Sequence, residues 1–313
     1  MAGPPDASSE QQRSSRDGAR EALLAWYRPR RSAYPWRTPV HPGARHPDAY
    51  AVLVSEVMLQ RTQAARVAPA FETFLSVFPD VRALAGASRA DVLRSWGRLG
   101  YPRRAVALHE AAKTIVTDHD GVVPRDPAAL RALPGVGEYT SAAIASLAFG
   151  VPVPAVDTNV RRIWARVVYG MEPDEVRRHE LILAAGEWLD RRRPATWNQA
   201  VMDLGRVVCR PKPRCDACPL RPWCAFAASG REGRASTVRR SPFPGSLRQV
   251  RGAVLAALRS GSPRTIGGLA TTTGFEPERV TEAVGGLDAD GLATATTAAL
   301  HGRRGGRVSL ADG

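Results

Sequence analysis

The chain has 313 residues, a formal net charge of +14 and four cysteines. This length allows two or three domains with cores of their own, and the basic balance favours a polyanionic partner, nucleic acid first. The first twenty residues lack the apolar stretch of a signal peptide, and the longest uncharged run is broken by Gly150, Pro152 and Pro154. We therefore expect a cytoplasmic protein with no membrane partner, and disulfides are rare in that compartment.

Helical periodicity dominates the chain after a polar tail. Residues 1–18 are polar and are expected to form a disordered tail. From about residue 21 to residue 226 apolar residues recur at helical spacing, as in the stripe Val67, Phe71 and Phe74. Segment 151–156, VPVPAV, is expected to be extended, because proline disfavours helix on both of its sides.

The last part of the chain has a different pattern. Residues 229–247 are polar, rich in Arg and Ser, and are predicted to be a linker. Three short helices are expected over residues 248–259, 265–272 and 276–287. A turn-rich segment follows and favours a hairpin. Three helices and a hairpin indicate a small winged-helix-like domain over residues 248–313.

The four cysteines form one compact group, Cys209-x5-Cys215-x2-Cys218-x5-Cys224. A group of this kind indicates a bound metal or cluster. Zinc and an iron–sulfur cluster are the candidates. Zinc sites usually place two close pairs far apart, whereas here one close pair has a longer arm on each side. The spacing therefore favours a 4Fe-4S cluster, which could serve only to fasten the loop.

The sequence LPGVG at residues 133–137 lies between two helical segments. Its glycines allow a sharp turn, and the backbone N–H groups of Gly135, Val136 and Gly137 at the start of the next helix can bind a DNA phosphate. This is the helix-hairpin-helix pattern. The alternative is an ordinary tight turn between helices.

Two carboxyl groups occupy unusual positions. Glu56 stands among apolar residues in LVSEVMLQRTQ, where a buried charge is costly unless it is paired or neutralised. The ordinary alternative is a glutamate that faces solvent. Asp157 follows the extended segment and begins a helix. It can be a structural N-cap, and a helix start also favours the negative charge that a catalytic carboxylate needs.

These signals in this order resemble the helix-hairpin-helix DNA glycosylase superfamily, and most closely its MutY-type adenine glycosylases. The resemblance covers about residues 22–226 and rests on PWR, SEVMLQRTQ, WGRLGY, LPGVGEYT, VDTNVRR, NQAVMDLG and the cysteine motif. It implies a mainly α fold in which two helical domains flank a cleft. A six-helix barrel with the helix-hairpin-helix would span residues 50–156. The iron–sulfur cluster domain would combine residues 19–49 and 157–228.

The resemblance also implies roles for individual residues. Glu56 would be the acid that protonates a ring nitrogen of a flipped adenine, and Asp157 would stay ionised and stabilise the oxocarbenium-like sugar. Tyr139 and Asn159 would line this site. Adenine would bind to Trp36, Arg37 and Gln199, and the segments at the opposite base would contribute Gln60, Arg61, Thr62, Leu99 and Tyr101. The implied partner is double-stranded DNA with a mispaired or oxidised base pair, bound by a monomer.

The lysine count bears on the type of reaction. A glycosylase that also cleaves the strand needs a lysine amine for a Schiff base. In the endonuclease III-like relatives that lysine follows the hairpin, where this chain has Tyr139. Lys113 and Lys212 are the only lysines, and neither falls on a cleft motif. We therefore expect a monofunctional enzyme.

Three departures from the family pattern accompany this reading. Arg61 stands where the family commonly has a second glutamine, and the first two cysteines are separated by five residues rather than six. The 87 residues after Phe226 (313 − 226) do not resemble the Nudix-like domain that reads 8-oxoguanine in other members. Two alternatives are a related glycosylase for another mispaired or damaged base and a non-catalytic iron–sulfur DNA-binding protein.

Overall fold

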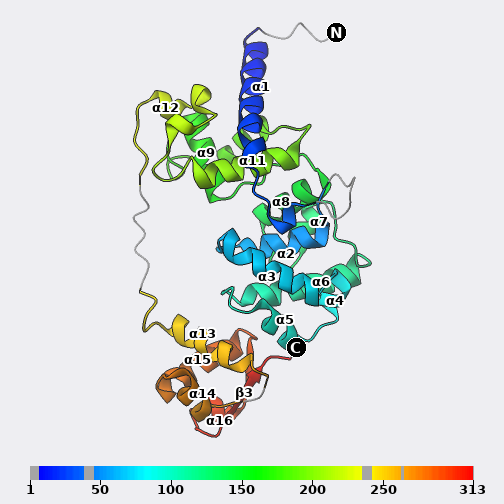
Figure 1. Cartoon of the computed structure of the whole chain (residues 1–313), viewed down its shortest axis with the longest axis vertical. Helices are drawn as coiled ribbons and strands as arrows, with labels where there is room; N and C mark the ends of the chain where they lie inside the picture. Colours follow the sequence, from blue (N-terminus) through cyan, green and yellow to red (C-terminus); the bar gives the residue numbers. More distant parts are fainter. Residues whose placement is uncertain (1–6, 39–45, 235–241, 262–263, 313) are drawn as a thin grey trace. The chain divides into compact units, whose positions relative to one another are not determined.

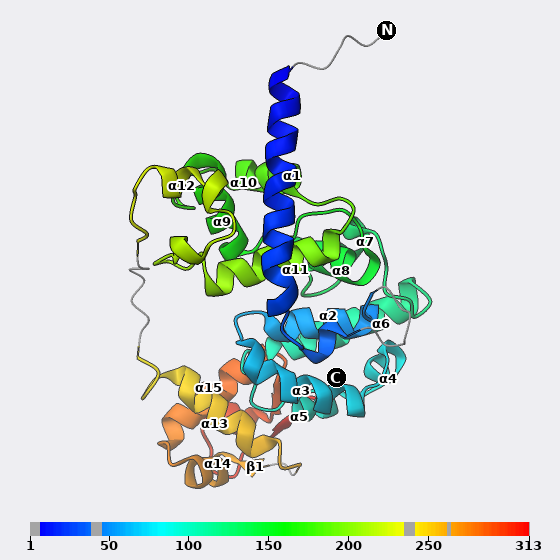
Figure 2. The same ribbon diagram turned by 45° about the horizontal axis from the view of Figure 1, so that its top comes forward.

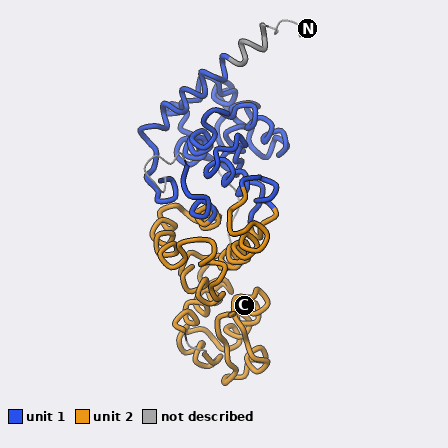
Figure 3. The backbone as a smooth tube through the Cα atoms, turned by 90° about the vertical axis from the view of Figure 1, so that its right-hand side faces the viewer, with its two compact units in different colours: residues 1–53, 125–131, 136–238 blue, residues 54–124, 132–135, 239–313 orange. Residues whose placement is uncertain are grey.

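The computed structural model describes residues 7–38, 46–234, 242–261 and 264–312. The chain divides into two compact units, which Figure 3 colours separately. The first unit consists of residues 1–53, 125–131 and 136–238, and the second of residues 54–124, 132–135 and 239–313. Helices α2 (Ala49–Leu59) and α7 (Pro127–Ala132) each contain a border between the units.

The described part of the first unit contains helices and no strand. Its longer helices are α1 (Ala7–Tyr27), α8 (Glu138–Phe149), α9 (Thr158–Tyr169), α10 (Arg178–Trp188) and α11 (Pro194–Val207), and α12 (Ala225–Ala228) is a single turn. Short 3-10 helices occur at Arg28–Arg30, Pro35–Arg37, Cys215–Ala217 and Arg221–Trp223. Figures 1 and 2 show α1 running beside α11, and the two helices are in contact.

Three tryptophans form the centre of this unit's core. The ring of Trp164 in α9 lies 5.5 Å from that of Trp188 in α10 and 6.3 Å from that of Trp197 in α11. Leu23 and Leu24 bring the apolar face of α1 onto the same cluster. The core therefore joins the N-terminal helix to helices more than 130 residues later (164 − 24 = 140), as the resemblance implies for the cluster domain.

The second unit has a helical part and a small mixed part. The helical part contains α3 (Ala64–Val77), α4 (Val81–Ala85), α5 (Arg89–Trp96) and α6 (Arg103–Asp118). Phe74 in α3 packs edge-on against Trp96 in α5, with ring centroids 6.1 Å apart. Ser88 is the N-cap of α5, and its hydroxyl accepts a hydrogen bond from the backbone N–H of Asp91 at 3.1 Å.

The C-terminal part combines helices with a three-stranded antiparallel sheet. Its elements are α13 (Leu247–Leu258), β1 (Arg264–Thr265), α14 (Ile266–Thr273), α15 (Pro277–Ala289), β2 (Ala293–Ala295), α16 (Thr297–Leu300) and β3 (Arg307–Leu310). The strand order is β1-β3-β2, and Val308 of β3 pairs with both Arg264 and Ala295. Helices α13, α14 and α15 contact one another, as Figure 2 shows. The expected three helices and hairpin are thus present.

One expectation about the N-terminus is wrong. Residues 1–18 were expected to be a disordered tail, but α1 begins at Ala7. Residues 1–6 lie outside the described part of the chain. Polar side chains dock this helix on the end of α10. Arg16 bonds to the Glu187 carboxylate at 2.8 Å, and Arg20 donates to the Glu187 carbonyl at 2.9 Å. These contacts satisfy carbonyls and complement charge at a helix C-terminus, an effect that hydropathy does not record.

The predicted extended segment at 151–156 contains no helix or strand, in agreement with its proline pattern. Within the described ranges, no helix combines the length and the apolar character that crossing a membrane requires.

Candidate active site and cysteine pocket

Asp157 is the N-cap of α9. Its carboxylate Oδ1 accepts hydrogen bonds from the backbone N–H of Asn159 at 2.9 Å and of Val160 at 2.7 Å. The Asn159 side-chain amide donates to the other oxygen, Oδ2, at 3.0 Å. Three donors thus fix the orientation of this carboxylate at a helix start, where negative charge is favourable.

Arg162 connects this cap to the cysteine loop. Its guanidinium donates to the side-chain oxygen of Asn159 at 2.9 Å, to the carbonyl of Gly205 at 2.9 Å and to the carbonyl of Cys209 at 2.7 Å. Gly205 is needed for this approach, because a Cβ there would lie 2.9 Å from the Cβ of Asn159. A continuous hydrogen-bonded path therefore runs from the first cysteine to the Asp157 carboxylate.

Asn198 in α11 holds the extended segment that leads to Asp157. Its side-chain oxygen accepts from the backbone N–H of Ala155 at 3.0 Å, and its amide donates to the carbonyl of Val153 at 2.9 Å and to Ser146 Oγ at 2.8 Å. The side chain is buried. This network gives the segment hydrogen-bond partners where its prolines prevent helix or sheet.

The residues expected to bind adenine belong to a polar network in the first unit. Gln199 accepts a hydrogen bond from the hydroxyl of Tyr27 at 2.9 Å. Arg37 forms a two-pronged ion pair with Asp203, at 2.9 and 3.3 Å, and lies 3.5 Å from the same hydroxyl. Burial raises the pKa of Tyr27, so its hydroxyl stays a donor at neutral pH.

Trp36, the third expected adenine-binding residue, is buried beside this network. Its ring stacks on Tyr34, with centroids 4.8 Å apart and planes 5° from parallel. The guanidinium of Arg37 lies 5.4 Å from the centre of the same Tyr34 ring. Tyr139, expected to line the catalytic site, contacts Met202 in α11 at 3.7 Å through its hydroxyl.

Glu56 lies in α2 and belongs to the second unit. Only 4% of its surface is exposed, and the neighbours Leu53, Val57 and Met58 are fully buried. The solvent-facing alternative is therefore wrong for this residue. Burial disfavours the charged form of a carboxyl group in general.

Arg104 organises the two segments expected at the opposite base. It donates to the carbonyls of Val57 at 3.0 Å and Met58 at 2.8 Å and also to that of Gln60, which terminates α2. Its Nη2 donates to Thr62 Oγ1 and to the carbonyl of Gly100, both at 3.1 Å. Burial lowers the pKa of Arg104 to about 10, which leaves it charged at neutral pH.

The tips of these two segments have strained backbones and touch each other. Arg61 has a φ of 58° and Tyr101 a φ of 47°, in the left-handed region that non-glycine residues rarely adopt. The guanidinium of Arg61 lies 4.8 Å from the ring centre of Tyr101. Leu99 is buried, whereas Tyr101 is exposed. Strain of this kind is typical of functional segments.

The hairpin at residues 133–137 has the expected sharp turn. Gly135 has a φ of +76°, and a Cβ there would lie 2.7 Å from the Cβ of Ala107, so both its conformation and the available space require glycine. Gln60 donates to the carbonyl of Gly135 at 3.3 Å. Gly137 caps α8, and among the described residues no side chain caps that helix start. The backbone N–H groups at that helix start can donate hydrogen bonds to an anion.

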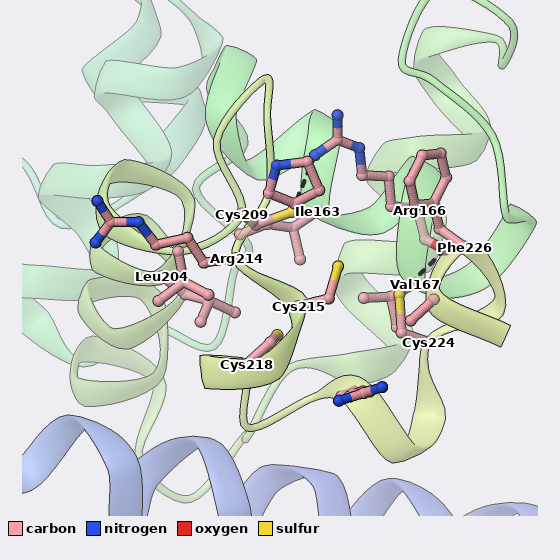
Figure 4. A pocket seen from close by; sticks show the side chains of 14 residues that line it. Ile163, Arg166, Val167, Leu204, Cys209, Arg214, Cys215, Cys218, Cys224 and Phe226 are labelled. Atoms are coloured by element: carbon pink, nitrogen blue, oxygen red, sulfur yellow. Dashed lines mark hydrogen bonds between the residues drawn. The ribbon is translucent and has the colours of Figure 1, made fainter. Parts of the chain in front are cut away.

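The four cysteines line one pocket, which Figure 4 shows from close by. All four are free thiols. The pocket wall is otherwise largely apolar and includes Ile163, Val167, Leu204 and Phe226. Arg166 holds the first cysteine, because it lies 3.7 Å from Cys209 Sγ and donates to the carbonyl of Pro211 at 2.9 Å. Arg166 is itself buried and paired with Glu172 at 2.8 Å.

The thiols fit a positively charged metal centre by their chemistry. Burial raises the pKa of Cys209 and Cys224, and it raises the pKa of Cys218 to about 12. Buried thiols ionise readily only when a metal compensates the charge of the thiolates. In the described part of the chain, no group of three or more His, Cys, Asp or Glu is arranged to hold a single metal ion.

The expected site residues are divided between the two units. The first unit holds Trp36, Arg37, Val136, Gly137, Tyr139, Asp157, Asn159, Gln199 and the four cysteines; the second holds Glu56, Gln60, Arg61, Thr62, Leu99, Tyr101 and Gly135. The pairing of Glu56 with Asp157 across a cleft stays a prediction.

Sequence reasoning missed five supporting residues, which are Tyr27, Arg104, Arg162, Asn198 and Asp203. Asn198 and Asp203 flank the expected Gln199 in NQAVMDLG, and Arg162 ends VDTNVRR, so the motifs contained these three without indicating their roles.

The helical fold, the hairpin and the cysteine pocket define a class of base-excision proteins. Residues 54–184 match the sequence family described as "HhH-GPD superfamily base excision DNA repair protein". Among solved structures, a thermostable thymine-DNA glycosylase aligns with a TM-score of 0.62 and 27% identity over 72% of this chain and all of that one. A non-covalent endonuclease III–DNA complex, 22% identical, shares the fold with a TM-score of 0.55 over 68% of this chain and 97% of that one.

Relatives with higher sequence identity identify the family within this class. An adenine DNA glycosylase of Mycolicibacterium smegmatis is 40% identical over 88% of this chain and 92% of its own length. One of Mycobacterium tuberculosis is 46% identical over 76% of this chain and 77% of its length. The human enzyme is 40% identical over 66% of this chain, but only 38% of its own length is matched. The chain belongs to the adenine DNA glycosylase family.

Proposed function

We propose that the chain hydrolyses the N-glycosidic bond of adenine in duplex DNA, where adenine is mispaired with 8-oxoguanine or guanine. The identity with adenine DNA glycosylases supports the choice of base. The observation that carries the chemistry is the contrast between two carboxyl groups. Glu56 is buried in the largely apolar helix α2, whereas Asp157 is held by three N–H donors at a helix start.

The contrast gives the two acids different tasks. The adenine leaves the base stack, and Glu56 donates a proton to one of its ring nitrogens. The bond between the base and C1′ of the sugar then breaks, and its electron pair leaves with the protonated adenine. The negative charge of Asp157 stabilises the oxocarbenium-like sugar. Water adds to C1′ and releases one proton, which leaves an abasic site.

The polar network around Gln199 supports recognition of adenine. Gln199 offers both a carbonyl and an amide, the complement of the donor and acceptor edge of that base. Tyr27 donates to the carbonyl of Gln199 and so orients its amide. Arg37 is held by Asp203, and Trp36 supplies a buried aromatic face. We assign these residues to the adenine pocket.

The reaction stops at base removal. Lys113 pairs with Glu110 in α6, and Lys212 lies in the loop between the first two cysteines. The position after the hairpin is Tyr139, whose hydroxyl cannot form a Schiff base. We therefore propose a monofunctional glycosylase.

A 4Fe-4S cluster is the proposed cofactor, held by Cys209, Cys215, Cys218 and Cys224. When bound, it would supply the positive charge that lets four buried thiols bind as thiolates and would fasten their loop. Arg162 then positions Asn159, and through it Asp157, relative to that loop. The cluster is thereby a structural support of the catalytic cap.

The experiment is a base-release panel on duplexes that carry one mispair. Wild-type protein should release adenine opposite 8-oxoguanine and opposite guanine, and leave thymine and uracil opposite guanine intact. Alkali should be needed to cleave the product strand, and borohydride should trap no protein–DNA adduct. Release of thymine or uracil in place of adenine would favour the related-glycosylase alternative. Binding to every duplex without base release would favour the non-catalytic one.

A further inference from the structure

A wide groove in the second unit lies between its helical part and its C-terminal part. One wall consists of residues 60–66 and 97–104, and the other of helix α13 with the end of α15. The groove has a volume of about 1160 Å³. This exceeds the upper end of small-molecule pockets, roughly 1,000 Å³, so a macromolecular ligand fits it better.

The charge of the groove is strongly one-sided. Its walls carry eight arginines, which are Arg61, Arg66, Arg98, Arg103, Arg104, Arg248, Arg251 and Arg259. Asp290 is the one carboxylate among the described residues that line it. The whole chain has 44 basic and 30 acidic residues. The groove, with eight basic residues and one acidic residue, is therefore far more basic than the chain as a whole. Arg251 pairs with Asp290, and Arg103 lies 3.5 Å from the same carboxylate.

The fold brings cations close to one another in this groove. Burial lowers the pKa of Arg259, and the nearby charge of Arg98 lowers it further. Burial likewise dominates the lowered pKa of Arg104, to which the charge of Arg61 adds. Arg259 also donates to the carbonyl of Leu93 at 3.1 Å and so fastens α13 to α5. Like charges held together in this way repel each other, and a bound polyanion relieves that repulsion.

We propose that this groove binds the sugar–phosphate backbone of duplex DNA, and that the C-terminal domain thereby extends the DNA-binding surface of the protein. The choice of DNA as the polyanion rests on the proposed function. The groove begins at Arg61 and Tyr101, the segments assigned to the opposite base, and continues onto α13. Guanidinium groups spread over two walls suit a row of phosphates, which fix register without reading sequence.

The test measures how binding to an undamaged duplex depends on salt. Fluorescence anisotropy gives the affinity of the full chain at several salt concentrations. One variant, Arg98→Ser/Arg248→Ser, removes an exposed arginine from each wall. The matched control, Arg303→Ser/Arg304→Ser, removes the same charge from an exposed turn of the C-terminal domain outside the groove. Thermal melting verifies that each variant is folded.

The slope of log affinity against log salt should be shallower by about 1.8 in the groove variant, because each lost phosphate contact contributes about 0.9. The control variant should keep the wild-type slope. If Arg98→Ser/Arg248→Ser does not fold, Arg98→Ser alone should reduce the slope by about 0.9. Equal slopes in wild type, groove variant and control would overturn the proposal. If the groove variant loses binding to poly-aspartate but keeps the wild-type slope on DNA, the ligand of the groove is an acidic protein. That result would also overturn the proposal.

Failure of this inference is distinguishable from failure of the proposed function. Binding to an undamaged duplex needs no base release. A shallower slope in a protein that releases no adenine would support the groove and contradict the glycosylase assignment. An unchanged slope in the groove variant of a protein that releases adenine would contradict the groove proposal and support the glycosylase assignment.

Discussion

Replacing Asp157 by asparagine separates its two roles. An asparagine keeps an oxygen that can accept from the backbone N–H groups of Asn159 and Val160, now at 2.9 and 2.7 Å. Asparagine is as good an N-cap as aspartate. The substitution keeps the backbone cap and removes the negative charge that the reaction needs. Asp157→Ala removes both functions and should cost about 1 kcal/mol of stability.

The catalytic effect can be estimated from Coulomb's law. A carboxylate about 4 Å from a developing positive charge, at an effective dielectric constant of about 20, stabilises it by about 4 kcal/mol. Because about 1.4 kcal/mol is a factor of ten in rate, Asp157→Asn should slow adenine release by about a thousandfold. The assay is single-turnover release with enzyme in excess over a duplex that contains adenine opposite 8-oxoguanine.

One local conflict predicts a measurable side effect of Asp157→Asn. The introduced amide would face the side-chain amide of Asn159, which now donates to Asp157 at 3.0 Å. Turning the Asn159 amide round would break its bond from Arg162. The variant should therefore lose about 1 kcal/mol, which the swap Asp157→Asn/Asn159→Asp should restore without restoring the rate. A folded Asp157→Asn variant that releases adenine within tenfold of the wild-type rate would show that the Asp157 charge does not stabilise the sugar cation.

Three further predictions concern the supporting residues. Tyr27→Phe removes the donor that orients Gln199 and should weaken binding of the adenine duplex several-fold, with about 1 kcal/mol lost from unfolding in denaturant. Arg104→Met should reduce the preference for 8-oxoguanine over guanine opposite adenine and lower stability by about 2 kcal/mol, because it frees the carbonyls that end α2. Cys218→Ser should lower the iron content and the visible absorption of purified protein and weaken DNA binding.

Each of these has a contradicting result. If Tyr27→Phe binds the adenine duplex with wild-type affinity, the Tyr27 hydroxyl does not contribute to the adenine pocket. If folded Arg104→Met keeps the preference for 8-oxoguanine over guanine, the two segments at the opposite base act independently of Arg104. Protein that is free of iron when expressed as wild type would exclude the cluster, whatever Cys218→Ser does.

The motifs predicted local backbone features better than they predicted long-range contacts. Glycine at position 135 and aspartate at position 157 follow from local backbone demands, a positive φ and a helix cap, which a short sequence displays directly. The contacts of Tyr27 with Gln199 and of Arg104 with α2 join residues 172 and 47 positions apart. No local pattern encodes such a distance, so single-sequence reasoning could not supply them.

Two other features could not be predicted from the sequence, because they depend on interactions that compensate an unfavourable local conformation. The polar beginning of α1 has no apolar stripe, and its docking on α10 depends on hydrogen bonds from Arg16 and Arg20. The positive φ of Arg61 and Tyr101 is unfavourable for each residue alone. The surrounding bonds of Arg104 to Gly100, Tyr101 and Thr62 hold those segments in place, and local propensity cannot anticipate them.

The most direct test of the central claim is the single-turnover rate of adenine release by Glu56→Gln. The substitution keeps the size of the side chain and removes the proton that adenine must receive. Glu72→Gln, on an exposed face of α3, is the matched control. The account predicts that Glu56→Gln binds the 8-oxoguanine:adenine duplex as wild type does and releases no adenine, while Glu72→Gln keeps the full rate. Adenine release by folded Glu56→Gln at the wild-type rate would contradict it.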